Sequence, residues 1–297
     1  MPIPGLTLDH VGLAVFDLEA ARVAFERMGF TLAPRSMHAG TMTAGGAVEP
    51  WGSGNHCAMF RRGYFEVLGL VDPALPSNVK KMLDRYQGMH IVALRCDSAD
   101  AGYAALQAAG VRSEAPMALE RDAIFGPAND GVRRAIFRNT YLDQTQTPEA
   151  RFIVIEHVTP EVLWQPHLLD HDNGAQALAE IIFVTDDLAA TEQRFTRFAG
   201  APTRQGDALR FDLAAGSLRV MTEAALRAAL PAELAAAPLH RVAGAGIEVT
   251  SLDALETLFQ ARGVRYVRAT TLDGAAPALW VGPEHAAHGI LQFTQSI

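Results

Sequence analysis

The sequence predicts an α+β fold in which four βαβββ modules pair into two cupped, barrel-like mixed sheets. Two observations lead to this prediction. A short apolar strand, followed by a helix that ends at glycine, recurs four times along the 297 residues. Further short strand patterns follow each recurrence. Because one curved module leaves a face of its sheet uncovered, two modules must pair to bury that face.

The opening strand and helix of each module are the clearest elements. The strands are predicted at Leu8–Val15, Met89–Arg95, Glu180–Val184 and Gly246–Val249. The helices are predicted at Glu19–Met28, Ala99–Ala109, Ala189–Ala199 and Leu252–Arg262. Short oxygen-bearing side chains that can cap free helix N–H groups precede them, namely Asp17, Asp97, Asp187 and Ser251 or Asp253. A glycine after each helix suits a left-handed C-terminal cap.

The remaining strands are shorter and complete the modules. They are predicted at Thr31–Arg35, His56–Phe60, Tyr64–Leu70, Arg134–Arg138, Arg151–Val158, Leu209–Leu213, Leu218–Thr222, Ala278–Val281 and Ile290–Thr294. Glu223–Pro238 is rich in Ala and Leu and predicts an extra helix, whereas Pro160–Gly174 is typical of a linker. We therefore expect two domains, residues 1–160 and 175–297, with modules paired within each.

Composition narrows the class of partner. The chain is 49% hydrophobic and 20% charged, and its formal charge of −8 comes with no run of Lys or Arg. That argues against nucleic-acid or anionic-membrane binding, which needs clustered cations. The first 30 residues lack a signal-peptide pattern, and no apolar stretch reaches the roughly 20 residues that cross a bilayer. Two cysteines give no disulfide framework, so a cytoplasmic location is expected. A small molecule is the expected partner, and a homodimer stays open.

The first half carries polar residues at matched places on apolar strands. His10 and His90 lie in opening strands, and Glu66 and Glu156 lie in closing strands. One such residue is usually structural, but the fourfold coincidence favours a metal site. Two neutral histidines and two carboxylates balance a divalent ion, and these ligands suit Ni, Co, Zn, Mn or Fe. The corresponding residues of the second half form no such set; they are Glu180, Gly246, Arg219 and Gln292.

Four segments carry a family resemblance: LDHVGLAVFDL, GMHIVALRCDS, YFEVLGL and FIVIEHV. Together they resemble the glyoxalase-like branch of the vicinal-oxygen-chelate superfamily. The resemblance implies that His10, Glu66, His90 and Glu156 converge on one divalent ion in residues 1–160, and that residues 175–297 form a second, ligand-poor domain of the same kind. Glu66 or Glu156 would then be the catalytic base.

Asn55 and His56 are weaker candidates for substrate contact, because they lie on the strand next to Glu66. A core or edge role is favoured for His56.

Three functions remain open. The leading hypothesis is a metal-dependent lyase or isomerase of glyoxalase type, acting on a small substrate chelated through adjacent oxygens. The second is an Fe(II) extradiol dioxygenase, in which His10, His90 and Glu156 would form the facial triad. The third is a non-catalytic protein that binds or sequesters a small molecule. The ligand-poor second half disfavours the dioxygenase, whose metal belongs to the second pair of modules, and an intact ligand set disfavours the binder.

Overall fold

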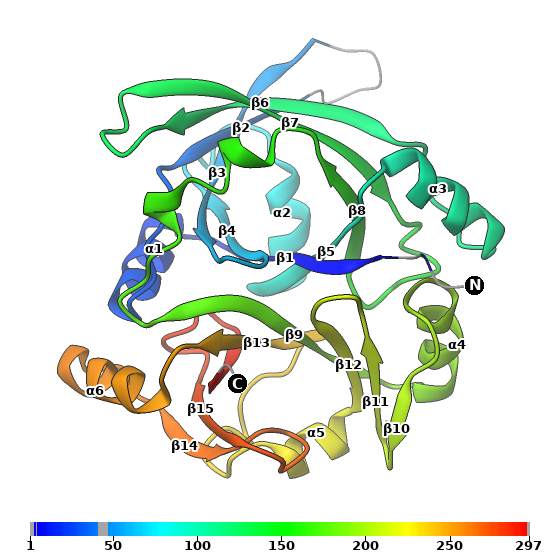
Figure 1. Cartoon of the computed structure of the whole chain (residues 1–297), viewed down its shortest axis with the longest axis vertical. Coiled ribbons are helices and arrows are strands. Elements are labelled where there is room, and N and C mark those ends of the chain that lie inside the picture. The colour runs from blue at the N-terminus through cyan, green and yellow to red at the C-terminus, as the bar shows by residue number, and fades with distance from the viewer. Residues whose placement is uncertain (1–2, 4, 41–46, 296–297) are drawn as a thin grey trace.

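Each half of the chain folds into two βαβββ modules, and the two halves lie one above the other (Figure 1). The computed structural model describes residues 3, 5–40 and 47–295. The first module contains β1 (Thr7–Val15), α1 (Leu18–Arg27), β2 (Ser36–Gly40), β3 (Glu49–Met59) and β4 (Tyr64–Leu70). The second contains β5 (Gly88–Arg95), α3 (Ala99–Ala108), β6 (Met117–Phe125), β7 (Gly131–Tyr141) and β8 (Arg151–His157).

The second half repeats this order. The third module contains β9 (Ala175–Thr185), α4 (Leu188–Ala199), β10 (Thr203–Gln205), β11 (Ala208–Asp212) and β12 (Ser217–Thr222). The fourth contains β13 (Val242–Val249), α6 (Leu252–Arg262), β14 (Val267–Thr270), β15 (Pro277–Val281) and β16 (Ile290–Gln295). Two helices lie between modules, α2 (Asn78–Leu83) and α5 (Glu223–Ala229). The predicted fold class is confirmed.

Strand pairing joins the modules within each half. β1 runs parallel to β4 and antiparallel to β5, and β5 runs parallel to β8. β9 and β13 repeat this pattern with β12 and β16. Few pairings connect the sheets of the two halves in the described chain: Val242 pairs with Met89, and isolated bridges join Thr7 to Ala215 and Arg62 to Ala177. Each half therefore forms one curved set of strands with a concave face, and we call the two halves the N-terminal cup and the C-terminal cup.

One strand, one helix and one helix cap differ from the sequence prediction, and the shifted cap has the largest consequence. The second strand is Ser36–Gly40 instead of Thr31–Arg35, and the extra helix is shorter than predicted. The caps are Asp17, Ser98, Asp187 and Ser251, each accepting a hydrogen bond from a first-turn N–H group. The cap of the second module is thus Ser98, one residue beyond the predicted Asp97. This shift changes which residues of the two modules correspond.

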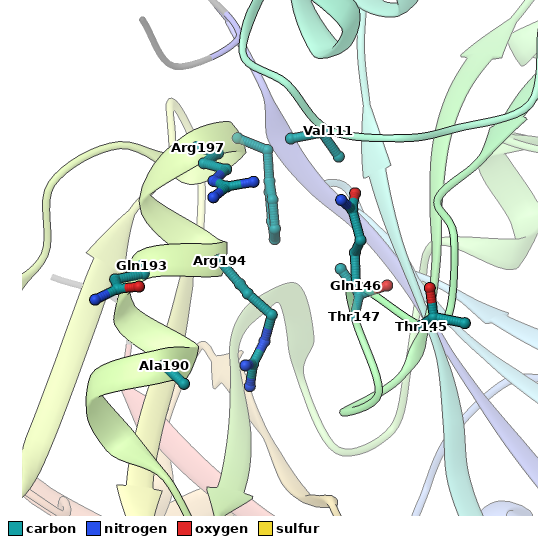
Figure 2. Close-up of a pocket in the computed structure, with 9 residues that line it drawn as sticks. Val111, Thr145, Gln146, Thr147, Ala190, Gln193, Arg194 and Arg197 are labelled. Atoms are coloured by element: carbon teal, nitrogen blue, oxygen red, sulfur yellow. The ribbon is translucent and has the colours of Figure 1, made fainter.

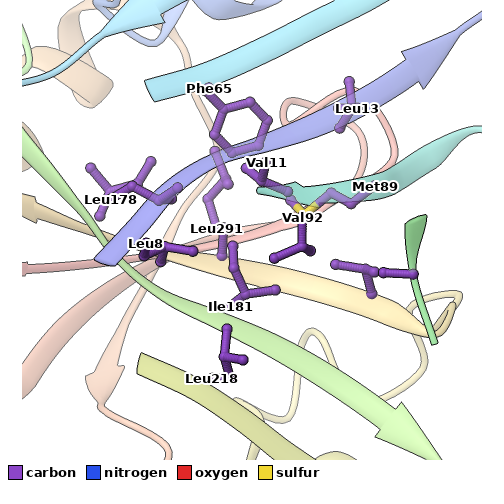
Figure 3. Close-up of a cluster of buried hydrophobic side chains, with 14 of the residues drawn as sticks. Leu8, Val11, Leu13, Phe65, Met89, Val92, Leu178, Ile181, Leu218 and Leu291 are labelled. Carbon is purple, nitrogen blue, oxygen red and sulfur yellow. The ribbon is translucent and has the colours of Figure 1, made fainter. Parts of the chain in front are cut away.

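The two cups face away from each other, and their convex faces pack together (Figures 1 and 3). Val11, Leu13 and Val92 of the first half are buried in one cluster with Ile181 and Leu291 of the second half. Because strand side chains alternate between faces, Gly12 and Ala14 must face the N-terminal cup. The shared core therefore determines which residues each cup receives.

The C-terminal cup is filled with apolar side chains. Leu226 of α5 and the following Leu230 and Leu234 are buried against Ile182 and Trp280 of the sheet. Helix α5 and the residues after it therefore cover the concave face of this cup.

The polar residues of that cup neutralise one another. The buried Glu180 carboxylate accepts hydrogen bonds from Arg219 Nε at 3.0 Å and from Ser217 Oγ at 3.1 Å. The N-terminal cup is also partly covered, because Val79 and Leu83 of α2 pack on Leu68 and Ile91, but it holds a further group of polar side chains.

Candidate functional site in the N-terminal cup

A β-bulge at the start of β1 turns two consecutive side chains into the cup. Leu8 pairs with Leu94 and His10 pairs with Ala93, so Asp9 is an extra residue in β1. Leu8 and Val11 on either side of the bulge belong to the shared core. Asp9 and His10 therefore both lie on the concave side, which strict alternation would not allow.

Asp9 is the centre of a buried polar cluster. Its carboxylate accepts hydrogen bonds from His10 Nδ1 at 2.7 Å and from His157 Nε2 at 3.1 Å. Burial raises the pKa of Asp9, but the charges and hydrogen bonds of His157 and His10 outweigh burial and hold it well below its usual range. An ionised carboxylate can only accept, so each histidine uses one ring nitrogen for Asp9 and has the other free for a different partner. His157 Nδ1 is buried and has no hydrogen-bond partner among the described residues.

Aromatic rings surround this cluster. His10 stacks on Tyr64 with ring centroids 4.4 Å apart, and His157 meets Trp164 edge-on at 4.9 Å. Trp164 belongs to the segment after β8, whose Val162 and Leu168 are buried against the cup. The predicted linker thus closes one end of the cup.

Glu66 lies on the same concave face as His10, two residues further along the paired strands β1 and β4. His10 pairs with Tyr64 and Gly12 pairs with Glu66. Asn55 Nδ2 donates a hydrogen bond to Glu66 Oε1 at 2.5 Å, while Asn55 Oδ1 is buried and has no partner in the described part of the chain. Glu66 is only partly buried, so a ligand can reach it. The structure therefore brings together His10, Glu66 and Asn55 of the predicted set.

The second module presents different residues at the corresponding positions. Ser98 caps its helix 81 residues after Asp17, and the residue 81 after His10 is Ile91, not His90. Ala93 of β5 pairs with Ile153 of β8, just as Gly12 of β1 pairs with Glu66 of β4. The residues equivalent to His10 and Glu66 are thus Ile91 and Ile153, which have no metal-ligating atoms and lie in one apolar cluster.

The other predicted residues, His90, Glu156 and His56, form hydrogen bonds with backbone groups. His90 Nε2 bonds the backbone oxygen of Tyr86 at 2.9 Å, its ring stacks on Tyr86, and burial lowers its pKa to about 4. Glu156 lies on the face of β8 opposite His157 and accepts a hydrogen bond from Ala99 N at 2.8 Å, where it supports the start of α3. His56 lies on the face opposite Asn55 and bonds the backbone oxygen of Ala33 at 2.9 Å.

The residues present do not fit the four-ligand metal site that the resemblance implied. Among the residues that the structure describes, no three His, Cys, Asp or Glu side chains are grouped to hold an ion. The space expected beside His10 is also filled, because a Cβ at Gly12 would lie 2.8 Å from Ile91 Cβ. Two of the four equivalent positions carry ligating groups, and the other two are isoleucines.

Replacing Glu156 with Ala tests this assignment directly. We expect the free energy of unfolding to fall by about 1 kcal/mol, the usual effect of losing a helix N-terminal cap. Metal content and activity should match the wild type, because Glu156 faces away from the cup. Urea denaturation and elemental analysis of protein purified without chelators provide the measurements. Loss of a stoichiometric ion in this variant would restore the four-ligand site.

A separate cavity of about 250 Å³ lies between the loop after β7 and helix α4 (Figure 2). Thr145, Gln146, Arg194 and Arg197 contribute to its lining. Arg194 forms an ion pair with the buried Glu149, so part of its charge is already neutralised. None of the residues predicted from sequence lines this cavity.

Comparison with known families identifies the chain's relatives. The family model described as a glyoxalase-like domain matches residues 8–199. The chain belongs to this glyoxalase-like family. The match spans the whole N-terminal cup and continues through β9 and α4. Among curated proteins, none matches the chain by sequence. In the described part of the chain, no helix is long and apolar enough to cross a membrane.

Solved structures share the fold at low identity. A hypothetical protein from Staphylococcus aureus is 13% identical with a TM-score of 0.62, and the match covers 98% of this chain and all of the other. A catechol 2,3-dioxygenase is 14% identical with a TM-score of 0.53, covering 98% and 87%. A mutant of 4-hydroxymandelate synthase from Streptomyces coelicolor is 12% identical with a TM-score of 0.55, covering 99% and 93%. These likenesses show that the chain shares its fold with these proteins.

Proposed function

We propose that this glyoxalase-like protein is a lyase or isomerase that moves a proton on a small substrate bound in the N-terminal cup. The observation that carries the proposal is the Glu66 carboxylate, which lies on the concave face and is oriented by Asn55. A carboxylate oriented by a neighbouring amide and open to solvent is suited to act as a general base. The family membership supports a small substrate with adjacent oxygens.

The proton path uses only residues of the cup. Glu66 takes a proton from carbon next to a carbonyl group, and the polar groups of the cup hold the oxygen that gains negative charge. Because the described residues do not fit the four-ligand site, no step is routed through a metal. The extradiol dioxygenase loses its predicted triad for the same reason, since His90 is hydrogen-bonded to the backbone of Tyr86 and Glu156 to the start of α3.

Hydrogen exchange provides the test. The protein is incubated anaerobically in D₂O with 2-hydroxycarbonyl compounds and with 2-oxoaldehyde adducts, and exchange at the carbon next to the carbonyl is followed by NMR. We expect enzyme-dependent exchange without oxygen. Turnover of a catechol that strictly requires oxygen, with no exchange on any carbonyl compound, would instead support the dioxygenase.

A further inference from the structure

Arg121 is a cation inside the N-terminal cup. It lies on β6 and pairs with Ala135 of β7. Ala135 and Ala123 are buried with Cys57 and Tyr64 of the opposite wall, so this face of β6 and β7 looks into the cup. Strand alternation places Arg121 on the same face as Ala123.

The guanidinium of Arg121 is held in place by two contacts. Its Nη1 donates a hydrogen bond to Ser36 Oγ at 2.6 Å, which connects β6 to β2. Its Cζ lies 5.9 Å from the centre of the Phe137 ring, and Phe137 in turn contacts His157. Arg121, Phe137 and Glu66 are all only partly buried, so each side chain is accessible from solvent.

No described carboxylate pairs with Arg121 within ion-pair distance. The arginines on the outer face of β7 are paired: Arg134 lies 3.0 Å from Asp122, and Arg138 lies 2.7 Å from Asp100. The contrast indicates that Arg121 keeps its charge available inside the cup. A partly desolvated cation without a counter-ion favours an anionic ligand.

Strand pairing places Arg121 and Glu66 beside one cluster, because Cys57, which pairs with Glu66, is buried with Ala135, which pairs with Arg121. Burial raises the pKa of Cys57 to about 12, with Glu66 adding to this effect and Arg121 opposing it. Burial also raises the pKa of Tyr64; Glu66 raises it further and Arg121 lowers it. The two side chains therefore act on a common set of groups without forming an ion pair.

Two amide oxygens complete the lining. Asn55 Oδ1 and Asn139 Oδ1 are buried and have no partner within the described structure. Asn139 pairs with Ile155, which belongs to the apolar cluster of the cup. Buried acceptors of this kind normally receive a hydrogen bond, and a hydroxyl group of a ligand would supply it.

We propose that Arg121 binds an anionic oxygen of the substrate, and that the substrate is a small carboxylate with a hydroxyl or carbonyl oxygen next to it. This inference rests on the proton-transfer function proposed above. The substrate C–H bond breaks, Glu66 takes the proton, and the electron pair forms a C=C bond while the carbonyl pair moves onto oxygen. Arg121 holds the resulting enolate oxygen, and Glu66 returns the proton to carbon. No oxidant or reductant is needed.

Oxalate is the probe, because it is a planar dianion with adjacent oxygens, and neutral oxamide is its matched control. Binding is measured by calorimetry on chelator-treated protein. We expect oxalate to bind and oxamide not to bind. Arg121→Met should weaken oxalate binding about 10–100-fold, the usual range for losing a charged hydrogen-bond partner. Arg121→Lys should recover part of the affinity, and Arg134→Met on the outer face should leave it unchanged.

Further variants separate a binding role from a structural one. Ser36→Ala removes the contact between β2 and β6 but keeps the cation, so oxalate affinity should change less than about 3-fold. An equal loss in Ser36→Ala and Arg121→Met would overturn the proposal, as would oxalate binding that appears only after Mn²⁺ or Zn²⁺ is added. Circular dichroism checks folding, and Arg121→Lys replaces Arg121→Met if the latter unfolds.

The Glu66→Gln variant distinguishes the two proposals. It should retain oxalate binding while losing carbon-bound hydrogen exchange. Exchange that persists in Glu66→Gln, with oxalate binding still dependent on Arg121, would reject the base and keep the anion site.

Discussion

Turnover should fall about 10²–10⁴-fold when Glu66 is replaced by Gln, the usual range for loss of a general base. Gln keeps the size and hydrogen-bonding capacity of the side chain but cannot take a proton. The contact with Asn55 can therefore persist, and the free energy of unfolding should change by less than about 1 kcal/mol. The measurement is anaerobic exchange or isomerisation of 2-hydroxycarbonyl compounds and 2-oxoaldehyde adducts, followed by NMR.

Glu120 offers a matched control for this variant. It is an exposed glutamate on β6, 3.7 Å from Arg134 on the outside of the cup. Glu120→Gln makes the same chemical change and should leave turnover at the wild-type level. The proton-transfer function would be contradicted if Glu66→Gln turned over a catechol at the wild-type rate and only in the presence of oxygen.

Asp9→Asn is expected to cost about 3 kcal/mol of unfolding free energy at pH 7, the scale for removing one partner of a buried charged cluster. The Asp9 carboxylate holds His10 on β1 and His157 on β8, so it connects both modules of the cup. Asn carries no charge, and its side chain has one acceptor oxygen where the carboxylate has two, so its hydrogen bonds to the two histidines are weaker. Urea denaturation gives the free energy of each protein.

The pH dependence of this effect has a definite sign. The pKa of folded Asp9 lies below its usual value of 3.8, so its contribution to stability is complete above that value and is lost as pH falls towards the folded pKa. The difference between wild type and Asp9→Asn should therefore be constant from pH 7 to about 5 and shrink below about 4. The exposed Asp122→Asn should show a difference of less than about 1 kcal/mol throughout. A gap that widens in acid would contradict a buried, ionised Asp9.

The register between modules illustrates where sequence comparison goes astray. Aligning the two halves of the N-terminal cup on their histidines matches His10 with His90. Aligning them on the helix caps Asp17 and Ser98 matches His10 with Ile91. Both alignments read equally well as apolar strands, but the second is the one that hydrogen bonding follows. Asp97 and Ser98 are both suitable caps in the sequence, and only the observed cap, Ser98, gives the register that the strand pairing follows.

Arg121 and His157 carried no comparable signal. Arg121 lies in β6, whose sequence has no clear strand periodicity. It shares the cup with Glu66 only because the second module packs against the first. His157 follows Glu156 directly, and choosing between them depends on which face of β8 turns inward. A shift of one residue exchanges the two faces of a strand.

The sequence by itself determined the four modules, their order of strands and helices, the family, and the placement of Glu66 on the closing strand of the first module. These features are local: apolar periodicity, caps and glycine stops act within about 20 residues. Tertiary structure alone decided that Asp9 joins His10 in the cup, that Ile91 and Ile153 take the expected ligand positions, and that Arg121 lies on the cup face of β6. The physical reason is that bulges and cross-strand register are chosen by packing against the shared core, and a single extra residue in β1 reverses which side chains the cup receives.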